Sequence, residues 1–298
     1  MPLPKPTLRS LLSAPNSTGL REARSWAMAA GLLDQRGLTT LGQLVITKDP
    51  YLETTVTDWL MHFQLSRNHP FWNYFIYEFL PERVEFTQIE LMQQFTKVFA
   101  TETPERFQKI SSLILESYVD AETIGKHRFL VQEKSTYATG NPDLSNPYTT
   151  GYLLAEVWKR DFRTRKAVLV DDIFSTKQSL AHLLGISKEH LRQQLSILAK
   201  HEIIERRSAQ PHLVGDKPQM VNDEESSHQI YRCWSKPEEL LEKAYENDKA
   251  TPNRPLIQAL ESILDEEDET PDFSQFLEWA SELVGLGGGS KTITKLAS

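Results

Sequence analysis

The chain contains one cysteine, Cys233, among 298 residues, which excludes an intrachain disulfide and a zinc site built from several thiolates. No stretch approaches 18 consecutive apolar residues, so the sequence offers no membrane-spanning helix. The opening MPLPKPTLRS lacks the apolar core of a signal peptide. We therefore expect a cytoplasmic protein with no membrane partner.

Signatures of catalysis are also scarce. There is no G-x-S-x-G phrase, no metal-binding histidine spacing and no Rossmann fingerprint, and the glycine run near the C-terminus lacks the spacing of a phosphate loop. The best carboxylate cluster for a divalent ion is Asp171-Asp172, with Glu156 and Asp161 nearby in sequence. Adjacent aspartates more often mark a loop before a helix. We expect no cofactor and no metal site, and Mg²⁺ or Mn²⁺ would be needed only if the chain were a nickase.

Positive charge is scarce overall, since 33 lysines and arginines face 41 aspartates and glutamates, for a net charge of −8. This balance argues against a protein that coats itself with nucleic acid. Only residues 156–207 are net basic, with 11 basic and 7 acidic side chains. A cluster in this segment either extends a phosphate-binding surface or is simply solvated, and its members are Lys159, Arg160, Arg163, Arg165 and Lys166.

The clearest pattern in the chain lies within the same basic segment. An apolar stripe over residues 180–184 precedes Gly185, a turn residue, and Ser187 is placed to cap a second helix over 188–200. Leucines at i, i+4 and i+7 of that helix predict one buried stripe. The remaining side chains could reach phosphates or base edges, and those predicted to contact DNA are Lys188, Arg192, Gln193, Ser196 and Lys200.

The residues after this helix predict a wing. Arg206 and Arg207 end a charged strand and are added to the predicted DNA contacts. Residues 208–228 would form a long wing. A returning strand is predicted at 229–234 and a helix at 237–247. The fold predicted is mainly α and multi-helical, with winged helix-turn-helix units and a small β wing. Because winged helices also serve as protein-docking modules, DNA contact and protein docking both stay open.

Four regions are expected along the chain. They are a truncated helix-turn-helix-like unit at 1–48, a helical domain with an aromatic core at 49–150, the winged-helix domain at 151–250, and acidic C-terminal helices with a flexible tail at 251–298.

Several local signals predict where elements begin within these regions. Residues 21–33 are predicted to be helical, and Asp49-Pro50 to start the next helix. The aromatic run at 71–80 favours a core helix over a platform for stacking bases. The remaining predictions are a capping box of Thr87 and Glu90 opening a helix at 88–100, a helix from Thr103-Pro104 to Val119, a linker or exposed loop at 135–150, and a helix beginning at Tyr152.

Phrases spread over residues 19–248 give a family resemblance. The chain carries DPYLE at 49–53, WLMHF at 59–63, Arg21 and Arg24 within RxxRSWAMAAGLL, and the segment 152–158. In their order and spacing these phrases resemble the bacterial domain-of-unknown-function family 4007. Arg21 and Arg24 are added to the predicted DNA contacts. The chain departs from the family pattern at its N-terminus, where a Gly-His-Glu-Thr-Phe-like phrase is missing.

The resemblance implies a role on DNA. Members of the family are associated with DNA phosphorothioate modification and defence genes, and they include a protein described as a DNA nickase partner. We therefore expect a DNA-binding subunit of such a complex, whose partners are double-stranded DNA and other protein subunits, with a homodimer left open. The alternatives are a winged-helix transcriptional regulator, a metal-dependent nickase, and a scaffold that docks other proteins.

Overall fold

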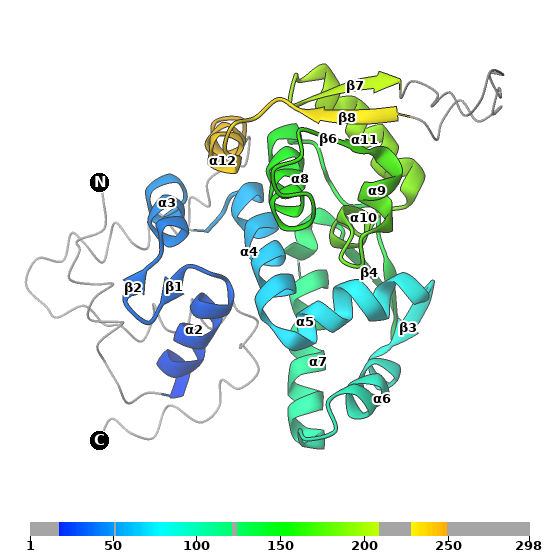
Figure 1. Cartoon of the computed structure of the whole chain (residues 1–298). Helices are drawn as coiled ribbons and strands as arrows, with labels where there is room; N and C mark the ends of the chain where they lie inside the picture. Colours follow the sequence, from blue (N-terminus) through cyan, green and yellow to red (C-terminus); the bar gives the residue numbers. More distant parts are fainter. Residues whose placement is uncertain (1–17, 51, 121–123, 209–227, 249–298) are drawn as a thin grey trace, which may run out of the picture.

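The N-terminal part of the structure is a small helical unit packed beside the main body (Figure 1). The computed structural model describes residues 18–50, 52–120, 124–208 and 228–248. Helix α2 (Thr18–Ala29) leads through a hairpin of β1 (Leu33–Asp34) and β2 (Gly37–Leu38) into α3 (Thr40–Lys48). The helix predicted to reach residue 33 ends at residue 29 instead, because Gly31 turns the chain with a positive φ of 69°.

The prediction that Asp49-Pro50 starts a helix is wrong. Asp49 ends α3, and its buried carboxylate accepts hydrogen bonds from the backbone amides of Glu53 and Thr54 at 2.9 and 3.0 Å. Helix α4 (Thr55–Asn68) begins later, capped by Thr54, whose hydroxyl accepts from the Thr57 amide. A threonine placed directly before the long apolar face therefore outcompetes the aspartate as N-cap, and Asp49 holds the turn between the two helices.

The aromatic run forms the centre of the body, as the sequence predicted. It is divided among α5 (Pro70–Tyr74), a π-helical turn η1 (Phe75–Phe79) and a 3₁₀ turn η2 (Leu80–Glu82). Phe75, Ile76 and Phe79 are fully buried. These rings therefore build the core and are not available to stack on bases.

Two helices and a small sheet complete this body. Thr87 and Glu90 form the predicted capping box, which opens α6 (Gln88–Val98), and α7 (Pro104–Val119) has the predicted bounds. The 3₁₀ turn η3 (Ile124–His127) follows α7 in the chain. The antiparallel sheet has the order β3-β5-β4, built from β3 (Glu85–Thr87), β4 (Leu130–Glu133) and β5 (Thr136–Thr139).

The segment predicted as a linker or exposed loop over 135–150 is a loop only at residues 140–146. It contains β5 and the start of α8 (Pro147–Asp161), which begins five residues before the predicted position because Asn146 caps it and Pro147 occupies its first turn. Residues 147 and 149–158 are buried, so α8 runs through the interior. One continuous hydrophobic core extends from Val45 to Ala244 across this segment.

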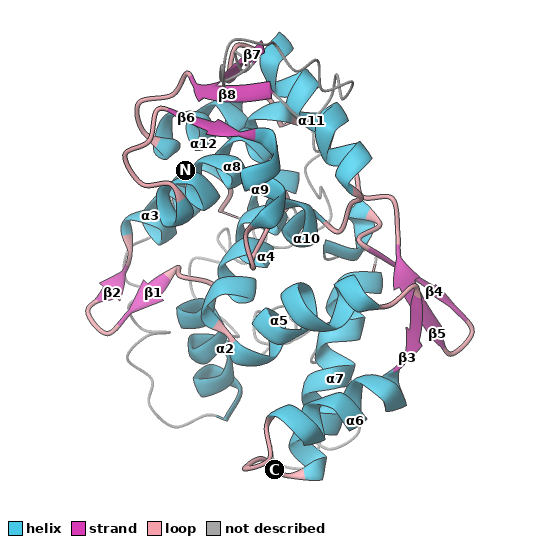
Figure 2. Ribbon diagram, turned by 45° about the vertical axis from the view of Figure 1, so that its right-hand side comes forward, coloured by secondary structure: helices cyan, strands magenta, loops and turns pink. Residues whose placement is uncertain are grey.

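The C-terminal half surrounds α8 with further helices and a second three-stranded sheet (Figure 2). In chain order its elements are β6 (Ala167–Leu169), α9 (Val170–Ser175), α10 (Leu180–Leu184), α11 (Lys188–Lys200), β7 (Ile204–Ser208), β8 (His228–Arg232) and α12 (Pro237–Glu246). The sheet is antiparallel with the order β6-β8-β7. The predicted wing between β7 and β8, and the predicted C-terminal helices and tail, lie outside the described residues. No helix in the described ranges is long and apolar enough to cross a membrane.

Candidate nucleic-acid interface

Helices α10 and α11 meet through a tight turn built as the sequence predicted. Ser179 and Ser187 cap the two helices, their hydroxyls accepting from the amides of His182 and His190 at 3.2 and 3.1 Å. Gly185 lies between them in the left-handed region, with φ 63° and ψ 36°. A Cβ at this position would approach Phe129 to 2.9 Å, so backbone conformation and space both require glycine.

The two sides of α11 differ as predicted. Leu191, Leu195 and Leu198 are fully buried. Gln194 is buried beside them, with 6% of its surface exposed. On the other side, the exposed residues are Lys188, Glu189, Gln193 and Lys200, and the half-buried ones are Arg192 and Ser196.

An aromatic ring supports the basic side chains in the first half of α11. The Lys188 ammonium and the Arg192 guanidinium lie 5.9 and 5.3 Å from the centre of the Phe174 ring on α9. Arg192 is also 3.7 Å from the Glu189 carboxylate one turn earlier. These contacts restrict the two cations to one side of the helix, which lowers the entropy lost when they bind an anion.

Arg206 and Arg207 lie on opposite faces of the second sheet, because successive side chains of a strand alternate. Arg206 faces α11 and donates a hydrogen bond of 2.7 Å to the Ser196 hydroxyl. Arg207 lies over the Tyr231 ring, 4.3 Å from its centre, and makes two 2.8 Å hydrogen bonds to the Glu205 carboxylate. Of the two predicted contacts, only Arg206 is therefore brought to α11.

The upstream basic cluster belongs to the end of α8 and the loop after it. The Arg160 guanidinium binds the Asp161 carboxylate twice at 2.7 Å and donates to the side chain and carbonyl of Gln178. It thereby connects α8 to the loop before α10. Lys159 lies 3.9 Å from Glu156. The remaining three members are exposed: Arg163, Arg165 and Lys166.

The N-terminal arginines are remote from this surface. Arg24 is exposed on α2, which is well separated from α11 in both views (Figures 1 and 2). The Arg21 side chain lies outside the described residues. The tertiary structure thus groups Lys188, Arg192, Ser196 and Arg206, with Gln193 and Lys200 on the same helix.

The candidate carboxylates do not assemble around a common point. Asp171 and Asp172 occupy the first turn of α9, a position where negative charge stabilises a helix. Asp161 is bound by Arg160, and Glu156 lies 3.7 Å from Arg67. Within the described ranges, no group of three or more metal-ligating side chains could hold an ion.

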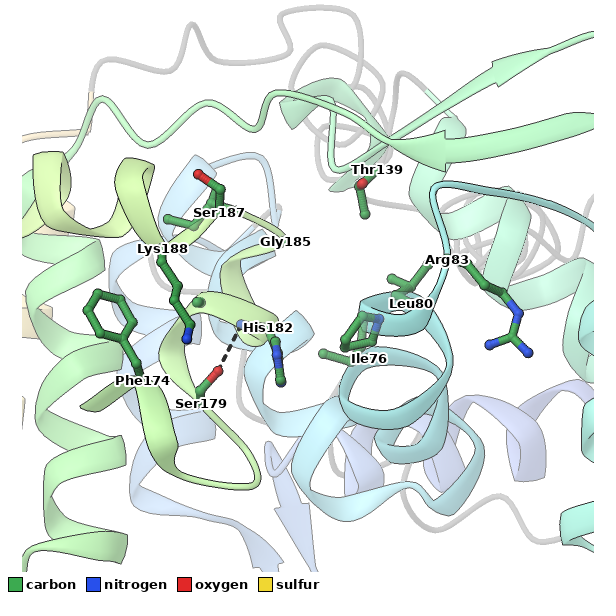
Figure 3. Close-up of a pocket in the computed structure, with 13 residues that line it drawn as sticks. Ile76, Leu80, Arg83, Thr139, Phe174, Ser179, His182, Gly185, Ser187 and Lys188 are labelled. Atoms are coloured by element: carbon green, nitrogen blue, oxygen red, sulfur yellow. Dashed lines mark hydrogen bonds between the residues drawn. The ribbon is translucent and has the colours of Figure 1, made fainter. Parts of the chain in front are cut away.

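Two histidines have structural positions that their spacing in the sequence did not reveal. His62 on α4 is buried and lies 2.7 Å from both the Tyr118 hydroxyl and the Leu183 carbonyl, so it joins α4 and α7 to α10. His182 on α10 lines a pocket of 330 Å³ beside the start of α11 (Figure 3). Burial and the neighbouring Lys188 lower the pKa of His182.

Comparison with known proteins connects this arrangement to a family. The family described as "Protein of unknown function (DUF4007)" matches residues 21–211. Two solved structures share the fold, described as "Magnesium ion-bound SspB crystal structure" and "SspB crystal structure", at 14% and 16% sequence identity and a TM-score of 0.54 each. The matches cover 88% of this chain and 82% and 83% of those chains. No curated protein sequence matches the chain.

Proposed function

We propose that this chain, which belongs to the DUF4007 family of proteins of unknown function, is a DNA-binding subunit of a phosphorothioate DNA-modification or related anti-phage defence complex. The proposal of DNA binding rests on the composition of α11. One side is a fully buried leucine stripe, while the other presents Lys188 and Arg192 over Phe174, with Arg206 beside them. Ammonium and guanidinium groups held on one helix face suit the phosphates of duplex DNA.

The order of elements supports a winged helix as the DNA-contacting unit. Helix α8 is followed by β6 and the short α9, then by the α10–α11 pair, and then by β7 and β8, with β8 placed between the other two strands. In a winged helix, the second helix of the pair enters the major groove and the loop between the last two strands forms the wing. By this assignment α11 is the recognition helix.

The weak positive charge of the chain favours action within an assembly. The protein carries a net charge of −8, and Glu189 lies 3.7 Å from Arg192 within the proposed interface. A single α11 therefore supplies few phosphate contacts, and contacts made by further subunits of an assembly would raise the overall affinity for DNA. The assignment to a modification or defence complex is supported by the family association and by the fold shared with the SspB structures.

The test is a salt series on two matched double variants of the full chain. We expect Lys188→Ala/Arg192→Ala to weaken binding of a labelled duplex, measured by fluorescence anisotropy. In a plot of the logarithm of the association constant against the logarithm of the salt concentration, each lost phosphate contact should reduce the magnitude of the slope by about 0.9. The control, Arg36→Ala/Lys97→Ala, removes the same charge from exposed positions in the β1–β2 turn and on α6.

The two variants separate a local contact from a general charge effect. If both variants lose affinity equally, long-range charge explains the binding and α11 has no special role. If neither changes the salt slope, the assignment of α11 as the DNA-contacting helix is wrong. Circular dichroism of all proteins checks that Arg192→Ala has not unfolded the helix pair by loss of its packing on Phe174.

A further inference from the structure

The pocket beside the start of α11 is bounded by two parts of the chain that are distant in sequence (Figure 3). His182 and Lys188 contribute from the helix pair, and Ile76 and Leu80 contribute from the aromatic body. Its volume of 330 Å³ falls within the range of about 300–1,000 Å³ that is usual for small-molecule sites. The pocket is thus large enough for an organic ligand.

The charge of the lining selects for an anion. None of the 13 residues that line the pocket is acidic, although the whole chain has a net charge of −8. Lys188 extends along one side of the pocket (Figure 3). Arg83 is the other cationic residue, but its guanidinium lies 4.1 Å from the centre of the Phe79 ring and is turned away. An anionic group of a ligand would therefore be placed near Lys188.

The remaining lining combines an apolar wall with a neutral imidazole. Ile76 and Leu80 are 0% and 5% exposed. Burial, together with Lys188, lowers the pKa of His182, so its ring is neutral at pH 7 and offers one donor and one acceptor. A flat ligand with donors and acceptors on its edge complements this arrangement.

We propose that the pocket binds a nucleotide, with its phosphate at Lys188 and its base between His182 and the wall formed by Ile76 and Leu80. A nucleotide combines the three features that the lining favours, namely an anion, a flat ring and a hydrogen-bonding edge. It is supplied either as a free nucleoside monophosphate or as an unpaired nucleotide of a DNA strand. Only the second source rests on the proposed function.

The test uses isothermal titration of the full chain with dTMP, thymidine and inorganic phosphate. We expect dTMP to bind at least about tenfold more tightly than thymidine or phosphate, because each of these lacks one group of contacts. Lys188→Ala should weaken dTMP binding and leave thymidine binding unchanged. Equal affinity for dTMP and thymidine in the wild type would overturn the proposal.

A second variant blocks the pocket without changing α11. Thr139 is exposed at the end of β5 and lines the pocket (Figure 3), so Thr139→Phe should weaken dTMP binding about tenfold or more. The matched control is Ala138→Phe, which adds the same ring to the opposite face of β5. Equal dTMP affinity in the two variants would refute the site. Thermal unfolding verifies that both variants are folded.

Competition identifies the source of the nucleotide. Displacement of dTMP by a single-stranded oligonucleotide supports binding of an unpaired nucleotide in a strand, and absence of displacement supports a free nucleotide. Duplex binding is measured separately with Thr139→Phe, which we expect to retain it. Two results together would refute the proposed α11 interface and leave the pocket proposal standing. They are loss of dTMP binding in Thr139→Phe and a salt slope of duplex binding that Lys188→Ala/Arg192→Ala leaves unchanged.

Discussion

Replacing His62 tests whether the helix pair is held to the body by a buried neutral imidazole. The Leu183 carbonyl can only accept, so Nε2 of His62 donates to it, and Nδ1 accepts from the Tyr118 hydroxyl, each at 2.7 Å. His62→Phe keeps a ring of similar size but removes both bonds. It leaves a hydroxyl and a carbonyl buried without this partner, each at a cost of about 1–3 kcal/mol. The expected loss of unfolding free energy at pH 7 is therefore about 2–6 kcal/mol.

The pH dependence of this loss distinguishes the proposed cause from simple repacking. Burial lowers the pKa of His62 from 6.5 to about 4. Between these values the unfolded chain takes up a proton that the folded chain excludes, so the wild type loses stability as the pH falls from 6.5 towards 4. The shift corresponds to roughly 3 kcal/mol. His62→Phe lacks this contribution, so the difference in stability between the two proteins should shrink by that amount.

Urea unfolding, followed by circular dichroism at several pH values from 7 to 4, measures this difference. His69 has a pKa lowered to about 4 by burial and by Arg106, but it is present in both proteins and its contribution cancels. A double-mutant cycle with Tyr118→Phe separates the hydroxyl bond from the carbonyl bond. A stability difference that stays constant from pH 7 to pH 4 would refute the buried neutral imidazole.

Three further predictions concern the helix pair and its neighbouring strand. Gly185→Ala should destabilise the protein by at least about 1 kcal/mol, because it places a Cβ in the left-handed region and against Phe129; a thermal midpoint equal to that of the wild type would contradict this. Ser187→Ala should cost about 1 kcal/mol of unfolding free energy through loss of the α11 cap, measured by urea unfolding. Arg206→Ala should weaken duplex binding in an anisotropy assay more than Arg207→Ala, which faces away from α11; the reverse order would place the DNA on the other face of the sheet.

Features that depend on neighbours in the chain were predictable from the sequence. The Ser187 cap, the Gly185 turn and the capping box of Thr87 and Glu90 each join residues within about one helical turn, so the pattern contains the whole interaction. The leucine stripe of α11 was predictable for the same reason, since helical periodicity alone decides which residues share a face. The order of α10, α11, β7, β8 and α12 follows from such local signals, whereas β6 and α9 were not predicted.

Competition between local signals was harder to judge. Both Asp49 and Thr54 are good helix caps, and only the packing of the helix that follows selects the threonine. Turn-forming residues over 135–150 predicted a linker or exposed loop, yet only residues 140–146 are a loop, and the segment also contributes β5 and the buried start of α8. Strand β5 pairs with β4 across the turn at residues 134–135, but its other partner, β3, lies far earlier in the chain, and a local pattern cannot predict that pairing.

The sequence by itself determined where the α10–α11 pair lies and which residues α11 turns outward. The tertiary structure decided which predicted cations share its surface, since the packing of β7 turns Arg206 towards α11 and Arg207 away, and Gln178 engages Arg160 elsewhere. It also brought Ile76 opposite His182 to form the pocket. The physical reason is that helix faces follow from periodicity within one segment, whereas charge clusters and cavities arise from the packing of segments that are distant in the chain.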